Sequence, residues 1–147
     1  MATEMKIKTS TFFFLFGLAV SLSKAQLLAC SCSKPLDAPG DMSKVDVVFV
    51  GQVIKGELKD RALEKGSYLS RDFELKVRET LKGKLESTVH IATGLGDNDC
   101  GFDFILGNDY LVYAYGSPQL ETNMCAGTKK FYPLGKKEVE QLKRNGK

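Results

Sequence analysis

The stretch Asp72-Phe73-Glu74-Leu75-Lys76-Val77-Arg78 alternates strictly between charged and apolar side chains. A period of two is typical of a β-strand that has one face on a hydrophobic core and the other face in water. We therefore expect Phe73, Leu75 and Val77 to point inward from a half-buried strand.

Further strands are expected on both sides of this one. Residues 45–54 are rich in β-branched side chains and contain Gly51, which predicts a bulge or a bend within a largely buried strand. Residues 88–93, 109–115 and 128–132 are predicted as the remaining strands. The charged residues 55–67 contain two glycines and predict a hairpin loop without a core of its own.

Two short helices are expected outside these strands. Asp41 or Ser43 is a suitable N-cap for the first, and residues 136–144 have the apolar spacing of the second. Five short strands without alternating helices indicate an all-β fold, and a five-stranded Greek-key barrel with flanking short helices fits best.

Residues 1–29 are predicted to be a signal peptide rather than part of the fold. Two lysines precede an apolar run over residues 11–20, and small residues follow. This run is shorter than the roughly 20 residues that a membrane span needs. We therefore expect a secreted protein without a membrane span, with a mature domain over residues 30–147.

The position of cleavage has more than one candidate. Ser23-Lys24-Ala25 favours cleavage after Ala25, so that the mature chain begins at Gln26. Cleavage after Ala29 is a weaker match and exposes Cys30. The same residues resemble a bacterial lipobox, in which Cys30 carries lipid and anchors a cell-envelope lipoprotein.

The composition of the mature domain excludes some classes of function. The 118 residues from Cys30 onward carry 18 Lys and Arg and 17 Asp and Glu. A net charge this close to zero gives no reason to expect nucleic-acid binding. Four cysteines in a small secreted chain predict two disulfides.

Catalytic and metal-binding patterns are weak. His90 is the only histidine, and we expect it to face solvent or lie at the rim of a strand, so we predict no enzyme and no cofactor. Residues 97–99 and Asp103 lack the spacing of an EF-hand and predict a solvated loop. The lysines at 129–130 and 136–137 are expected to form a solvated basic face.

The cysteines carry more information than any other residue type. Cys30 and Cys32 are too close to pair with each other, so each is expected to reach either Cys100 or Cys125. Closing loops of this length stabilises a fold by roughly 4 kcal/mol per disulfide in the chain-entropy model. A chain end is normally mobile, so two disulfides at one end either staple a small fold or indicate that this end is itself a working surface.

The sequence resembles the inhibitory N-terminal, netrin-like domain of the tissue inhibitors of metalloproteinases. The similarity lies in the Cys30-Ser31-Cys32 start, Val-Phe-Val-Gly at 48–51, residues 73–84, Cys100-Gly101 and Cys125, and it covers most of residues 30–132. The family fold is an OB-type five-stranded barrel with flanking helices. Vertebrate members carry a third disulfide and a C-terminal domain, so this chain resembles a minimal single-domain relative.

The resemblance implies a pairing and a site. It implies the disulfides Cys30–Cys100 and Cys32–Cys125, and it implies that the α-amine and carbonyl of Cys30 bind the catalytic zinc of a target protease. Ser31 would enter the adjoining specificity pocket. The remaining residues of this inhibitory wedge would be Cys32, Ser33, Lys34 and Pro35, flanked by Leu95, Gly96, Asp97, Asn98 and Asp99.

The first functional hypothesis is thus a secreted, monomeric inhibitor of zinc metallopeptidases, with the zinc belonging to the partner. The alternative is a non-inhibitory netrin-like binding module on the cell envelope, with a protein or polyanion ligand. A third hypothesis is a thiol oxidoreductase that uses the Cys-x-Cys pair, which requires free thiols.

Overall fold

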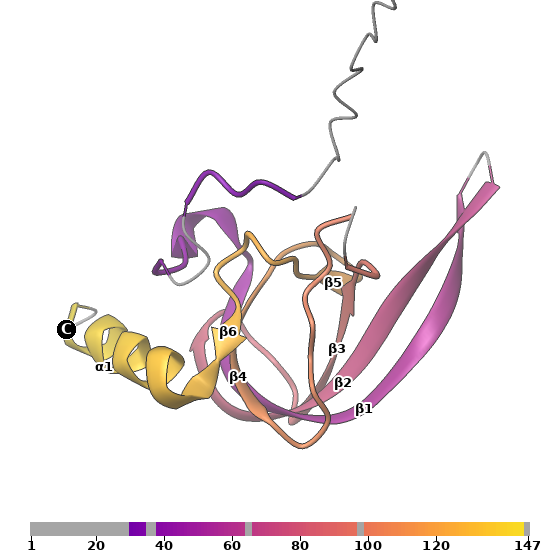
Figure 1. The fold of residues 1–147 in the computed structure, drawn as a ribbon. Helices are drawn as coiled ribbons and strands as arrows, with labels where there is room; N and C mark the ends of the chain where they lie inside the picture. The colour runs from indigo at the N-terminus through magenta and orange to yellow at the C-terminus, as the bar shows by residue number, and fades with distance from the viewer. Residues whose placement is uncertain (1–29, 35–37, 64–65, 97–98, 146–147) are drawn as a thin grey trace, which may run out of the picture.

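The structure is a computed structural model that describes residues 30–34, 38–63, 66–96 and 99–145. The fold is mostly β, with one mixed six-stranded sheet in the order β5-β3-β2-β1-β4-β6 and one short C-terminal α-helix (Figure 1). The strands are β1 Val47–Leu63, β2 Gly66–Lys82, β3 Thr88–Thr93, β4 Asp109–Ala114, β5 Leu120–Glu121 and β6 Lys129–Lys130. The helical elements are a 3-10 turn η1 (Met42–Lys44), a kinked turn η2 (Phe131–Gly135) in which Tyr132 has an extended backbone, and α1 (Lys136–Asn145).

The predicted all-β class is confirmed, and β3 has the predicted bounds. The strand count is different, because the two-residue β5 was not predicted. It pairs in parallel with β3, whereas the other strand pairs are antiparallel. The pairing gives a curved sheet rather than a closed barrel. Two backbone hydrogen bonds nevertheless join Tyr115, directly after β4, to Glu121 in β5, at 3.0 and 2.7 Å.

The prediction of a loop over residues 55–67 is wrong. β1 and β2 continue through most of this region as a two-stranded hairpin, paired from Lys55 and Glu74 outward to Leu63 and Gly66. This hairpin projects beyond the rest of the sheet (Figure 1). The prediction relied on alternating apolar residues, which indicate a strand with one buried face. The strands of this hairpin lack that pattern, because backbone pairing and cross-strand charge pairs hold them together.

Charges on one face of the hairpin converge on a single carboxylate. Asp72 is buried, and it forms salt bridges with Lys59, at 3.0 Å, and with Arg61. Glu57 adds a second carboxylate, 3.1 Å from Lys59. Opposite charges on neighbouring strands stabilise a sheet, which explains how a charged segment forms strands here.

The core lies on both sides of the sheet. Phe73, Leu75 and Val77 pack into the larger cluster, as predicted, together with Phe49 and Ile91. Gly51 lies at a shift in the β1–β2 register, which confirms the predicted bulge. A Cβ at Gly51 would lie 2.8 Å from the ring of Phe49, so glycine at this position also lets the ring pack closely.

The second cluster joins α1 to the outer face of β1 and β4. Val48, Val50, Leu111 and Tyr113 are buried against Val139 of α1. The helix prediction over residues 136–144 is confirmed to within one residue.

One basic residue contradicts the expected solvated lysine face. Lys129 is 6% exposed, and its Nζ lies 2.6 Å from Oε2 of Glu138, which is equally buried. Oε1 of Glu138 accepts hydrogen bonds from the Tyr113 hydroxyl, at 2.5 Å, and from the Gly40 amide, at 2.9 Å. Burial and the adjacent carboxylate both raise the pKa of Tyr113 far above its usual value, so its hydroxyl stays a donor. The sequence did not indicate this pair, because its partners meet only when α1 docks.

Candidate functional site

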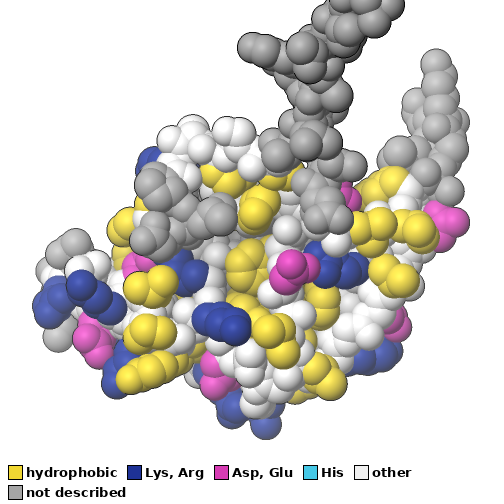
Figure 2. Space-filling view, viewed as in Figure 1, with side chains coloured by type: hydrophobic (Ala, Val, Ile, Leu, Met, Phe, Trp, Pro, Cys, Tyr) yellow, Lys and Arg dark blue, Asp and Glu magenta, His cyan; other side chains and the backbone are white. Residues whose placement is uncertain are grey.

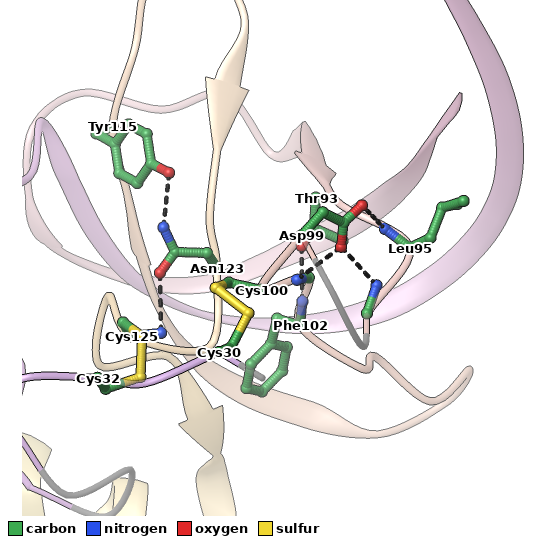
Figure 3. The surroundings of a disulfide bond; sticks show 12 residues. Cys30, Cys32, Thr93, Leu95, Asp99, Cys100, Phe102, Tyr115, Asn123 and Cys125 are labelled. Carbon is green, nitrogen blue, oxygen red and sulfur yellow. Dashed lines mark hydrogen bonds between the residues drawn. A yellow bond between two sulfur atoms is a disulfide. The ribbon is translucent and has the colours of Figure 1, made fainter. Parts of the chain in front are cut away.

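The two disulfides join the N-terminal segment to two different loops. Cys30 is bonded to Cys100 and Cys32 to Cys125, with Cα–Cα distances of 5.3 and 5.2 Å (Figure 3). These are the pairings that the resemblance implies. All four cysteines are in disulfides, which leaves no thiol for an oxidoreductase of the Cys-x-Cys type and fits an oxidising, extracellular compartment.

Hydrogen bonds join the two loops that receive these disulfides. The Met124 amide donates to the Cys100 carbonyl at 2.9 Å. The Asn123 side chain accepts from the Cys125 amide at 2.8 Å and donates to the Tyr115 hydroxyl at 2.9 Å (Figure 3). The anchor points of Cys30 and Cys32 are therefore fixed relative to each other and to the end of β4.

The loop that carries Cys100 is organised by one carboxylate. Asp99 accepts hydrogen bonds from the backbone amides of Leu95, Gly96 and Gly101, at 2.7, 2.8 and 3.2 Å. Partial burial raises the pKa of Asp99, but the backbone hydrogen bonds outweigh it and leave the pKa below its usual value. Asp99 is exposed, as the predicted solvated loop requires, and it also holds its own loop in shape.

Arg71 fixes the same loop from β2, and sequence analysis missed it. Its Nε donates to the Gly94 carbonyl at 3.0 Å, and its Nη1 lies 2.6 Å from Oδ1 of Asp103. Its remaining nitrogen donates to the Phe102 carbonyl at 3.4 Å. The only signal in the sequence was an arginine next to the alternating strand, which does not identify its partners.

The predicted wedge is partly described. Ser31, Ser33 and Lys34 are exposed, whereas Cys30 and Cys32 are half-buried. On the flanking loop, Leu95 is 45% exposed. Pro35, Asp97 and Asn98 lie outside the described residues. The structure therefore brings an exposed serine between two anchored cysteines to the side of the Leu95–Cys100 loop.

The chain is fixed again just beyond the wedge. The Lys129 ammonium donates to the Ala38 carbonyl at 2.7 Å, and Glu138 accepts from the Gly40 amide. A Cβ at Gly40 would lie 2.4 Å from the ring of Tyr113, and one at Gly127 would lie 2.4 Å from the Cα of Gly40. Only glycine allows this close approach, and it places the segment against the loop that carries Cys125.

A hollow of about 240 Å³ lies where the wedge, the segment that follows it and the loop around Cys125 meet. Its lining includes Ser33 and Lys34 from the wedge, Asp41 and Lys44 from the η1 region, and Asn123 from the opposite loop.

His90 is exposed on β3, as expected. Within the described ranges, no three His, Cys, Asp or Glu side chains are grouped as a metal ion would need. None of the helices among these residues has the length and apolar character to cross a bilayer.

Comparisons with known proteins give no family assignment. No protein-family model matches the sequence, and a search of curated proteins also finds no match.

Proposed function

We propose that the protein is a secreted inhibitor of zinc metallopeptidases and acts through the α-amine and carbonyl of Cys30. The observation that supports this most directly is the double attachment of Cys30 and Cys32, with exposed Ser31 between them. Under this proposal the chain is a relative of the tissue inhibitors of metalloproteinases, and its curved sheet corresponds to their OB-type barrel. The Tyr115–Glu121 bonds, which bring β4 close to β5, support that relationship.

The chemistry follows from the coordination of a catalytic zinc. Such a zinc has three protein ligands and keeps one position for water. An α-amine has a pKa of about 8, so a substantial fraction is neutral near pH 7.5 and can displace that water. The carbonyl of the same residue then closes a five-membered chelate ring. Cys30 would supply both atoms, and Ser31 would enter the pocket beside the zinc.

Rigidity is what the structure adds to this chemistry. A free N-terminus would lose conformational entropy on binding, and this loss would weaken the complex. Here the two disulfides, the Met124–Cys100 hydrogen bond and the Asp99-centred loop hold the wedge before it meets a partner. Most of the ordering cost is therefore met during folding rather than during association.

The decisive experiment compares two N-termini of one domain. One protein begins at Cys30, and its matched control begins at Ala29, so the α-amine is replaced by a peptide bond and both disulfides are retained. Each is titrated against a panel of zinc metallopeptidases with fluorogenic peptide substrates. We expect inhibition by the Cys30 protein and none by the Ala29 protein.

N-terminal sequencing of the naturally secreted protein completes this test. A start at Cys30 with a free amine supports the mechanism. Equal inhibition by both forms, or a natural start at Gln26, would refute it. Ligand binding that persists in the Ala29 form, without effect on any peptidase, would favour the non-inhibitory binding module.

A further inference from the structure

Charge is strongly segregated along the mature chain. Residues 129–147 contain seven basic residues (Lys and Arg) and two acidic residues (Asp and Glu). Residues 30–128 contain eleven basic and fifteen acidic residues. The net charges of these two parts are therefore +5 and −4. Such asymmetry is a feature of proteins that meet a charged surface with one end.

The fold gathers this charge at one end of the molecule. The elements β6, η2 and α1 follow each other there, away from the tip of the β1–β2 hairpin (Figure 1). Lys129 and Glu138 neutralise each other in the interior, so the exposed positive charge comes mainly from Lys130, Lys136 and Lys137. In the later turns of α1, Glu140 is also exposed and Lys143 is paired with Glu79. Figure 2 shows Lys and Arg side chains along this end, next to apolar ones.

Two large apolar side chains stand out between these lysines. Tyr132 is 77% exposed and Leu134 is 50% exposed, and both belong to η2. Phe131, directly before them, packs against the second core cluster. The turn is thus anchored by one aromatic residue and presents the next one to solvent.

We propose that this basic-aromatic turn, Lys130–Lys137, binds the surface of a membrane that contains anionic lipids. Lysines near such a surface are attracted by its negative potential, while exposed tyrosine and leucine side chains enter the boundary between headgroups and acyl chains. A sulfated polysaccharide or a nucleic acid would satisfy the lysines but would offer no apolar layer to Leu134. The combination of both side-chain types therefore favours a bilayer as the partner. This proposal does not depend on zinc binding by Cys30.

The test uses the domain over residues 30–147 and sedimentation with vesicles. Vesicles of 30% phosphatidylglycerol in phosphatidylcholine are compared with vesicles of pure phosphatidylcholine, at low and at physiological salt. We expect binding to the anionic vesicles only, weakened by salt. Because the chain has no tryptophan, Tyr132→Trp gives a single tryptophan, which can be excited apart from the tyrosines and whose emission should shift to the blue when these vesicles are added.

Matched variants assign the binding to this turn. Each lysine near an anionic surface is worth about a factor of five in partitioning, so Lys136→Gln/Lys137→Gln should weaken binding roughly 25-fold. Tyr132→Ser should also weaken it without changing the charge. Lys55→Gln/Lys76→Gln removes the same charge from exposed positions in β1 and β2 and should leave binding within about twofold. Circular dichroism verifies that each variant is folded.

Three outcomes would overturn the proposal. One is the absence of wild-type binding to 30% phosphatidylglycerol, and another is equal weakening by both lysine pairs. The third is that the protein binds both a heparin column and the vesicles, that Tyr132→Ser changes neither, and that Tyr132→Trp gives no blue shift. This result would identify a polyanion site instead. Loss of vesicle binding leaves the inhibition assay unchanged, so failure of this proposal and failure of the proposed function can be told apart.

Discussion

Replacing Lys129 by methionine tests the buried ion pair that attaches α1 to the N-terminal segment. The substitution keeps the length and apolar stem of the side chain but removes the ammonium group 2.6 Å from Glu138. It leaves a carboxylate that is 7% exposed without its cation, and the Ala38 carbonyl without the donor at 2.7 Å. Breaking a buried pair in this way costs about 3–5 kcal/mol.

That cost is a large fraction of the stability of a domain of this size, which is typically about 5–15 kcal/mol. It corresponds to a fall in Tm of about 10–20 °C. Glu138→Gln should cost a similar amount, because it leaves a buried ammonium group. The double variant Lys129→Met/Glu138→Gln buries no charge and keeps an acceptor for Tyr113 and Gly40, so it should lie within about 1–3 kcal/mol of the wild type.

The measurement is urea unfolding of the oxidised protein, followed by circular dichroism, for both single variants and the double variant. The coupling energy should be about 3 kcal/mol or more. The chain provides a matched control in Lys143 and Glu79, which lie at the same 2.6 Å but with side chains 51% and 40% exposed. Exposed pairs contribute about 0–1 kcal/mol. If Lys129→Met costs no more than Lys143→Met, the pair is not desolvated and the argument fails.

Two other predictions concern the loops that hold the wedge. Cys32→Ala/Cys125→Ala removes the second crosslink while Cys30–Cys100 stays closed, so the loop it opens runs only through residues 30–32 and 100–125. The free energy of unfolding should fall by about 3–4 kcal/mol; a loss below about 1 kcal/mol in urea unfolding would contradict this role. Asp99 has a lowered pKa in the folded protein, so the stabilisation that it gives its loop is complete above its unfolded pKa of about 3.9 and is lost as the pH falls through the folded value. The measurement is protection of the Leu95 and Gly96 amides from hydrogen exchange, corrected for the intrinsic exchange rate. This protection should weaken in acid for the wild type and stay constant for Asp99→Asn. Protection that does not depend on pH in the wild type would refute the argument.

The elements that could be predicted from sequence are those in which burial leaves a periodic trace. β3 and the inner half of β2 alternate because one face of each lies on the core, and α1 repeats its apolar positions for the same reason. The outer arms of β1 and β2 leave no such trace. Their stability comes from backbone pairing and from the charges around Asp72, and a charged run such as residues 55–61 is equally compatible with a loop.

The candidate site also has a part that could be predicted from the sequence and a part that could not. Cysteine spacing pointed to a constrained N-terminus, because two cysteines separated by one residue are too close to form a disulfide with each other and need distant partners. The residues that shape the receiving loops were harder to foresee. Arg71 lies some 30 positions before the carbonyl of Phe102, and Lys129 was expected in solvent although it is paired inside the fold. Such contacts depend on how elements dock in three dimensions, and the identity of a single charged residue does not encode its partner.

The disulfides separate the stability of this domain from its proposed activity. They act on the sulfur atoms of Cys30 and Cys32, whereas zinc binding would use the amine and carbonyl of Cys30. Residues retained before Cys30 would leave both crosslinks and the sheet unchanged and would remove only the amine. Cleavage after Ala29 and cleavage after Ala25 should therefore give domains of nearly equal stability, of which only one can chelate zinc. Processing of the precursor, rather than folding, would then decide whether an inhibitor is produced.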